Sequence, residues 1–198
     1  MNIEEVRSLV RHELPLERYE HTLRVAETAV ELATMYDTNV RHAELSALLH
    51  DVAKYRTPEE LKQYIQHSSL PNDLLDYHHE LWHGPVGSMI ARDEYGIDCL
   101  DIQQAIRYHT TGREGMSTLE LVIFVADYIE PGRKIPGIND VRQQVKVNLI
   151  EAAWMVSSRT IEHLMNKRVT IYPDTFYAYN DLTRRFYNNS YEPTEINN

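Results

Sequence analysis

Apolar residues recur every three or four positions along most of the chain, which is the spacing of amphipathic helices. In residues 16–36, for example, such a stripe runs through Leu23, Ala26 and Val30. Residues 140–166 carry a similar stripe, which predicts one long helix there. We find no stretch with the alternating pattern of a strand. The fold class we expect is therefore all-α, a single helical bundle.

Capping signals define where several of these helices begin. Asn39 is a candidate N-cap for a helix that runs to about Tyr55. Thr57-Pro58-Glu59-Glu60 is a capping box with proline at the first helical position. Ser117-Thr118-Leu119-Glu120 is a second capping box, and it opens the helix that carries Asp127.

Glycine and proline mark the helix ends. A helix over HGPVGSMIARDEYG is expected to end at Gly96, and the helix with Asp127 is expected to stop at Pro131. A last helix is expected over about 174–187. The length of 198 residues fits one domain over 1–190, with its core at about 15–182. The polar tail 191–198 is expected to be disordered.

Composition and charge exclude several classes of protein. The formal net charge of −10 argues against a general nucleic-acid binder, which would show a basic stripe. No apolar run approaches the ~20 residues of a membrane span, and the start MNIEEVRSLV is not a signal peptide. The single Cys99 is compatible with a reducing cytoplasm, and its apolar flanks favour an inert thiol. We expect a cytoplasmic protein without a membrane or nucleic-acid partner.

Histidine and aspartate form an ordered series that carries the candidate chemistry. Its centre is the adjacent pair His50-Asp51, which can flank one point at the edge of a helix because neighbours are ~100° apart. Imidazole and carboxylate ligands together suit zinc, iron, manganese or nickel rather than calcium. Any one of these histidines read alone could be a surface or core residue. The six candidate metal ligands are His21, His50, Asp51, His83, His109 and Asp127.

Cationic and hydroxyl side chains near these residues are candidate phosphate binders. Arg24 and Lys54 each lie about one turn beyond a candidate ligand, on the same helix face. Arg133 follows Asp127 on a loop, and Thr110 follows His109. The alternative roles are a solvated helix face for Arg24, a helix C-terminal charge for Lys54 and helix termination for Thr110.

Other histidines are assigned less specific roles. His79 and His83 are four residues apart, a spacing that can chelate a metal. The Gly-Pro break directly after His83, together with the family resemblance described below, favours His83 as the ligand. His79 is then a candidate proton donor to the leaving group. His12, His42, His67 and His163 lie in polar stretches and are expected on the surface.

Taken together, HTLRVAETA, LLHDVAK, HGPVGS, HTTG and ADYIEPGR resemble the motifs of HD-domain metal-dependent phosphohydrolases. Within that family the chain is most similar to the bacterial symmetrical bis(5'-nucleosyl)-tetraphosphatases of the YqeK type. The resemblance covers about residues 15–182. It implies an HD-domain bundle with a dinuclear metal site and a nucleotide substrate.

The resemblance also implies how the ligands divide. One ion would be held by His21, His50, Asp51 and Asp127, and a second by His83 and His109, with Asp51 bridging. The resemblance implies iron, with manganese, cobalt or nickel as possible substitutes. Two such ions can turn a shared water into hydroxide at neutral pH, which would attack phosphorus in line. Asp51 is thus the central catalytic residue.

The substrate implied is a dinucleoside polyphosphate, with diadenosine tetraphosphate cut into two ADP as the leading case. Two alternatives stay open. One is another HD-type nucleotide phosphatase or phosphodiesterase, and the other is a nucleotide-sensing module without turnover. The complete ligand series argues against the second. The sequence leaves the nucleobase contacts and the oligomeric state open, a homodimer included.

Overall fold

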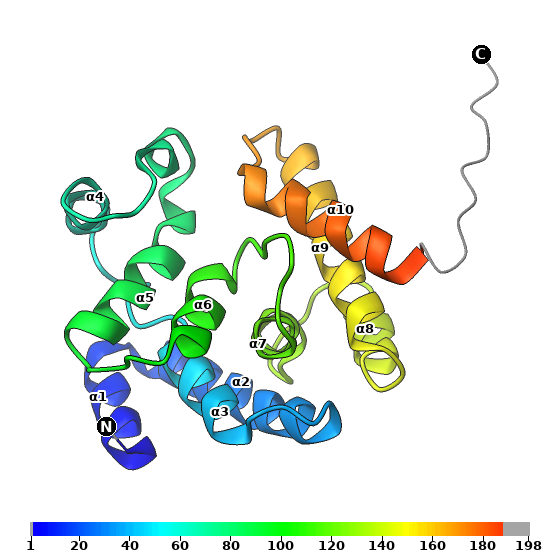
Figure 1. Ribbon diagram of the computed structural model, residues 1–198, viewed down its shortest axis with the longest axis horizontal. Coiled ribbons are helices and arrows are strands. Elements are labelled where there is room, and N and C mark those ends of the chain that lie inside the picture. The colour runs from blue at the N-terminus through cyan, green and yellow to red at the C-terminus, as the bar shows by residue number, and fades with distance from the viewer. Residues whose placement is uncertain (1, 188–198) are drawn as a thin grey trace.

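The structure, a computed structural model, describes residues 2–187. This part of the chain contains ten α-helices and two short 3₁₀ turns (Figure 1). Within that range there is no strand, so the all-α prediction is confirmed. The elements are α1 (Ile3–Glu13), α2 (Leu16–Met35), α3 (Val40–Leu49), α4 (Pro58–Gln66), η1 (Asn72–Asp76), η2 (His79–Leu81), α5 (His83–Asp93), α6 (Leu100–Tyr108), α7 (Thr118–Ile129), α8 (Ile138–Gln144), α9 (Leu149–Asn166) and α10 (Pro173–Tyr187).

The predicted helix starts are confirmed. The side chain of Asn39 accepts a hydrogen bond from the backbone N–H of His42, as an N-cap does. Thr57 and Ser117 each form a complete capping box with the glutamate three residues later. These short-range contacts satisfy N–H groups that the helix itself leaves unpaired, which is why local sequence could predict them.

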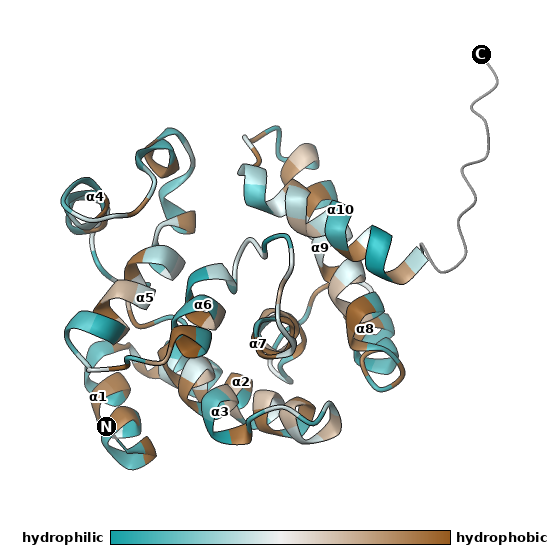
Figure 2. Cartoon of the chain, in the orientation of Figure 1, coloured by the Kyte–Doolittle hydropathy of each residue, from teal (hydrophilic) through white to brown (hydrophobic). Residues whose placement is uncertain are grey.

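Helix α7 forms the centre of the bundle. Figure 1 shows it end-on, between α2 and α3 on one side and α9 and α10 on the other. Nine of its twelve residues are buried, and its ribbon is mostly brown in the hydropathy view of Figure 2. A helix that is apolar on most sides is buried in the core, and Asp127 lies in the last turn of α7.

The prediction of one long helix over residues 140–166 is wrong. The chain forms α8 and α9 instead, with a break between Val145 and Asn148. Asn148 has an extended backbone, and its side chain accepts a hydrogen bond from the N–H of Glu151. A capping asparagine therefore starts a new helix and overrides the continuous apolar stripe.

The helix predicted to reach Tyr55 also ends earlier. Helix α3 stops at Leu49, and His50 is its C-cap. The following residues form tight turns, in which the N–H groups of Val52 and Lys54 bond to carbonyls three residues back. Asp51 therefore lies in a turn after the helix rather than within it.

The Gly-Pro pair after His83 does not interrupt a helix. His83 is the first residue of α5, and Gly84 and Pro85 form its first turn, where proline is tolerated. A Cβ at Gly84 would lie 2.8 Å from the carbonyl oxygen of Arg107, so glycine is needed for α5 to approach α6 closely.

The C-terminal helix is confirmed as α10, and the predicted disordered tail 191–198 lies outside the described residues. Among the helices of residues 2–187, none combines the length and apolar content that a membrane crossing requires.

Candidate metal centre

The ends of three helices bring three of the candidate histidines together. His50 is the C-cap of α3, His83 is the first residue of α5, and His109 is the C-cap of α6. His21 comes from α2, and Asp127 from the last turn of α7. With Asp51, all six predicted ligands converge at one place, although they span more than 100 residues of sequence.

Asp51 lies at the centre of this cluster, and its side chain is fully buried. Its Oδ2 atom lies 2.9 Å from His50 Nε2 and 3.7 Å from His21 Nε2. Its Oδ1 atom lies 3.2 Å from His83 Nε2 and 4.0 Å from His109 Nε2. The two carboxylate oxygens thus face two different pairs of imidazoles.

Asp127 completes the group on the Oδ2 side. Its Oδ1 atom lies 3.1 Å from His21 Nε2 and 3.8 Å from His50 Nε2. On the other side, the Nε2 atoms of His83 and His109 are only 3.0 Å apart. Within the cluster, two groups of three residues each have their ligand atoms within 4.8 Å of one another. One group is His21, His50 and Asp127, and the other is His50, Asp51 and His109.

Each of the four histidines uses its Nδ1 atom to bond outside the cluster. Three of them bond to the main-chain carbonyl three residues earlier, at 2.6 to 2.7 Å. His21 instead bonds to the side chain of Glu130, at 3.1 Å. A proton on Nδ1 leaves Nε2 with a lone pair, and this arrangement orients histidines that bind metals. The carbonyl acceptors are Ala47, Glu80 and Ile106.

The donor atoms at the centre fit a cation. His21 Nε2, His50 Nε2 and both oxygens of Asp51 are buried and make no hydrogen bond of normal geometry. Buried polar atoms without partners are costly and rare. Four lone-pair donors of the nitrogen and oxygen type, aimed at one region, are what a transition-metal ion would satisfy.

Electrostatics inside the cluster favour charged carboxylates. Burial would raise the pKa of the Asp51 carboxyl, but His50 and His83 hold it well below its usual range. The pKa of Asp127 is likewise low, because the adjacent His21 ring and the charge of Arg133 outweigh the effect of its burial. Burial and the neighbouring histidines lower the pKa of His109 to about 3, so its ring is neutral.

Two residues of the centre were missed by sequence reasoning. Arg18 forms an ion pair with Asp51, and its Nε atom is buried without a hydrogen bond. Glu130 accepts hydrogen bonds from Arg24 Nε and Gly132 N, both at 2.6 Å, besides its contact with His21. Arg18 precedes His21 by three residues, one helical turn, and this spacing was the available signal.

The predicted phosphate binders lie around the cluster, each with a partner of its own. Arg133 donates to Asp127 Oδ1 at 2.7 Å. Lys54 forms an ion pair with Glu80, and Thr110 Oγ1 lies 3.1 Å from His109 Nε2. His79 is not within the cluster: its side chain is 46% exposed and stacks on His78.

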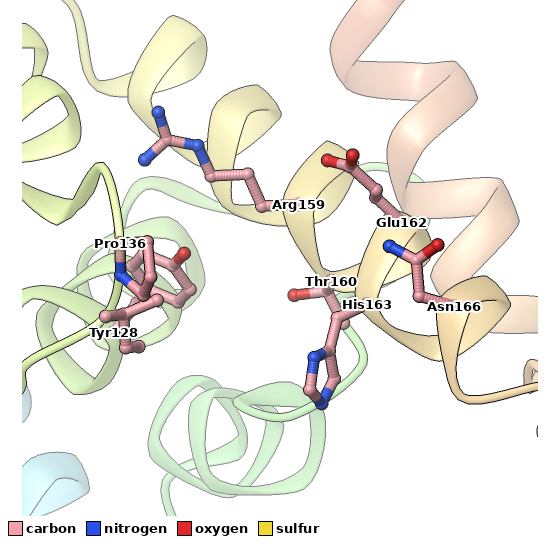
Figure 3. Close-up of a pocket in the computed structure, with 8 residues that line it drawn as sticks. Tyr128, Pro136, Arg159, Thr160, Glu162, His163 and Asn166 are labelled. Atoms are coloured by element: carbon pink, nitrogen blue, oxygen red, sulfur yellow. The ribbon is translucent and has the colours of Figure 1, made fainter.

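A cavity of about 270 Å³ opens onto the cluster from the His21 side. Three arginines line it together with His21, namely Arg18, Arg24 and Arg133. The rest of the wall consists of Glu17, Tyr55, Glu130 and Gly132. A second cavity, of about 430 Å³, lies where Tyr128 and Pro136 face Thr160 and His163 of α9 (Figure 3). It contacts none of the six cluster residues, so the cluster is served by the smaller, cationic cavity.

Comparison with known proteins agrees with this arrangement. The HD domain model matches residues 18–132, which include all six residues of the cluster. The chain is 46% identical to the symmetrical bis(5'-nucleosyl)-tetraphosphatase of Bacillus subtilis (strain 168), over 92% of this chain and 98% of that protein. It is 44% identical to the protein of the same name from Staphylococcus aureus (strain NCTC 8325 / PS 47), over 91% of this chain and 97% of that protein.

A solved structure has the same fold. The crystal structure of a "predicted HD superfamily hydrolase involved in NAD metabolism" from Clostridium acetobutylicum superimposes with a TM-score of 0.88 at 33% identity. The alignment covers 93% of this chain and 98% of that one. The family match, the near full-length relatives and the shared fold confirm the resemblance drawn from the motifs, and the chain belongs to the HD-domain family.

Proposed function

We propose that this protein is a metal-dependent hydrolase of dinucleoside polyphosphates, and that it cleaves diadenosine tetraphosphate symmetrically into two ADP. One observation carries the proposal. A single buried carboxylate, Asp51, turns its two oxygens toward two separate pairs of histidine nitrogens. Relatives that match over almost their whole length are named for this reaction.

The proposed ligand sets follow the two sides of Asp51. His21, His50, Asp51 and Asp127 would hold one ion, and His83, His109 and Asp51 the other. We propose iron, for which manganese, cobalt or nickel could substitute. When bound, two such ions supply Lewis acidity toward phosphate oxygens and activate water as the nucleophile.

The protein's own contribution is to hold these donors ready. Helix termini deliver His50, His83 and His109, and main-chain carbonyls fix the orientation of their rings. Such pre-organisation lowers the barrier because little rearrangement is needed when charge develops in the transition state. The buried, apolar α7 fixes Asp127 in the same way.

Cations around the cavity would neutralise the polyphosphate. Arg18, Arg24 and Arg133 line it directly. We add Thr110, which lies beside His109, and Lys54, which pairs with Glu80, as proposed phosphate contacts. Each arginine is already held by a carboxylate, so its position is fixed before the substrate arrives. With the two proposed ions bound, this pocket would be positive in a protein of net charge −10 and would attract an anionic substrate locally.

The leaving group places modest demands on the protein. ADP leaves through a phosphate of low basicity, so a strong general acid is dispensable. His79, exposed in η2, is the proposed proton donor if one takes part. Its replacement by glutamine should therefore have less effect than loss of any ligand of the cluster.

Product analysis tests the proposal. The metal-loaded protein is incubated with diadenosine tetraphosphate, nucleoside monophosphates, triphosphates and cyclic dinucleotides, and the products are separated by chromatography. Two ADP from diadenosine tetraphosphate is the expected result. ATP plus AMP would refute symmetric cleavage, preferential turnover of another nucleotide would favour the phosphatase alternative, and binding without turnover would favour the sensing module.

A further inference from the structure

A second group of metal-binding side chain types lies outside the catalytic cluster. His42, Cys99 and Asp101 offer a nitrogen, a sulfur and an oxygen that all lie within 4.8 Å of one another. His42 was expected to be a plain surface histidine, and Cys99 an inert thiol. Folding brings them together although 57 residues separate them in sequence.

The contact between the two soft donors has the dimensions of a metal site. Cys99 Sγ lies 3.8 Å from His42 Nδ1. In a tetrahedral zinc site with Zn–S and Zn–N bonds of normal length, these two atoms would be about 3.5 Å apart. A shift of a few tenths of an ångström would therefore admit an ion between them.

The surrounding backbone holds these residues in place, and within residues 2–187 the contact between His42 Nδ1 and Cys99 Sγ is the only hydrogen bond of their side-chain donor atoms. The N–H of His42 is fixed by the Asn39 cap in the first turn of α3. Cys99 is the N-cap of α6, but its side chain makes no capping hydrogen bond. Asp101 is in the first turn of α6 and is exposed, while His42 and Cys99 are half-buried. A site of this kind is accessible to an ion from solvent.

We propose that His42, Cys99 and Asp101 form a third metal site, which takes a zinc-type divalent ion and leaves its fourth position to water or another ligand. Thiolate, imidazole and carboxylate are the three ligand types that zinc takes from proteins. The catalytic cluster contains no sulfur, so the two sites differ in chemistry. They also differ in place, because His42 precedes His50 by eight residues, roughly 12 Å along a helix.

An ion at this position would connect the two helices that deliver catalytic ligands. His42 is near the start of α3, which ends at His50. Cys99 and Asp101 are at the start of α6, which ends at His109. A metal bridge between the N-terminal ends of α3 and α6 would restrain both helices, and with them the spacing of His50 and His109 at the other ends.

Cobalt(II) absorption spectroscopy tests the third site. A cobalt ion bound by a thiolate gives an intense sulfur-to-metal charge-transfer band, which nitrogen and oxygen ligands cannot give. Cys99 is the only cysteine of the chain, so this band reports the proposed site alone. Titration with cobalt(II) of the reduced full-length protein, after its catalytic cluster has been loaded with metal, should produce the band. It should saturate at one further ion per chain, and Cys99→Ser should abolish it.

Variants of the other two ligands separate a built site from a thiol that binds cobalt alone. His42→Ala and Asp101→Asn should each weaken cobalt binding at least ~10-fold, because loss of even an outer-shell partner typically costs about that much in metal affinity. His163→Ala, an exposed histidine of α9, is the matched control and should leave the band unchanged. No band in the wild type, or unchanged affinity in either ligand variant, would overturn the site. The readout does not depend on hydrolysis of any nucleotide.

Discussion

The two sides of Asp51 are built differently. On the Oδ2 side, His21, His50 and Asp127 are surrounded by charge, with Arg18, Arg133 and Glu130 in contact and a cationic cavity beyond. On the Oδ1 side, His83 and His109 face each other at 3.0 Å, and main-chain carbonyls hold their Nδ1 atoms.

This difference separates two tasks within one cluster. The charged side combines proposed metal ligands with groups that can contact a polyphosphate, and its guanidinium groups balance its carboxylates. The other side contains only imidazoles besides the shared Asp51 oxygen, and an imidazole nitrogen must be unprotonated to bind an ion. Substitutions should therefore act through charge on the first side and through proton binding on the second.

The largest effect is expected where the two sides meet. Asp51→Asn keeps the size of the side chain but removes the charge that both proposed ions share. We expect kcat/KM to fall by at least ~100-fold, or ~2.7 kcal/mol of barrier, and by more than in Asp127→Asn or His109→Gln. Metal content and steady-state kinetics measured on the three variants check this. Activity within ~10-fold of wild type would show that Asp51 does not serve both sides.

Phosphate contacts should rank next. A charge-assisted hydrogen bond to phosphate is worth ~1.5–3 kcal/mol, so Arg24→Ala or Lys54→Ala should lower kcat/KM roughly 10- to 150-fold if the contact strengthens in the transition state. Metal content should stay the same, and Lys54→Arg should restore activity only in part, because a planar fork does not replace a compact ammonium.

Lys62→Ala is the matched control for Lys54→Ala, because Lys62 is an exposed lysine of α4. If Arg24→Ala and Lys54→Ala both keep full kcat/KM and full metal content, the two residues do not contact the phosphate. Their role is then only the ion pair that each forms, Arg24 with Glu130 and Lys54 with Glu80.

Glu130→Gln tests His21, the one histidine of the cluster whose Nδ1 atom bonds to a carboxylate. Loss of an outer-shell partner typically costs 10- to 100-fold in metal affinity, and His21 bonds to Glu130 through Nδ1. Metal affinity measured by competition with a chelator should fall by this factor. Glu120→Gln is the control, because Glu120 is equally buried and pairs with Arg113 away from the cluster. Equal metal affinity in both variants would contradict the role of Glu130.

Per pH unit, the smallest effect is the pH dependence of the folding stability of the metal-free protein. The pKa of His109 is lowered to about 3 in the fold, whereas an unfolded histidine has a pKa near 6.5. The unfolded state therefore binds a proton that folded His109 refuses, so stability falls as the pH drops from ~6.5 toward ~3. The contribution is at most ~1.4 kcal/mol per pH unit.

Denaturant unfolding at several pH values measures this slope. In the chelator-treated protein, His109→Gln should flatten the fall of stability below pH ~6.5, because glutamine does not titrate. Histidine resonances in NMR should show the His109 ring neutral at pH 5. If His109 instead titrates with a pKa near that of an unfolded histidine, the proposed difference in proton binding between the two sides of Asp51 is contradicted.

Local sequence determined the helices that have strong start signals. Capping residues such as Asn39, Thr57 and Ser117 act on N–H groups within three residues, so their contacts do not depend on the rest of the fold. The break at Asn148 and the end of α3 at Leu49 were missed because an apolar stripe continues through both places. Periodicity shows which face is buried, but it does not show where the backbone turns.

For the centre, the sequence by itself determined the pool of six candidate ligands, because their residue types and motifs are unusual. Only the tertiary structure decided that Asp51 presents one oxygen to each pair of histidines. It also brought Arg18 and Glu130 to the cluster, and His42 to Cys99. These are contacts between side chains far apart in sequence, and their geometry depends on how whole helices pack, which no local pattern encodes.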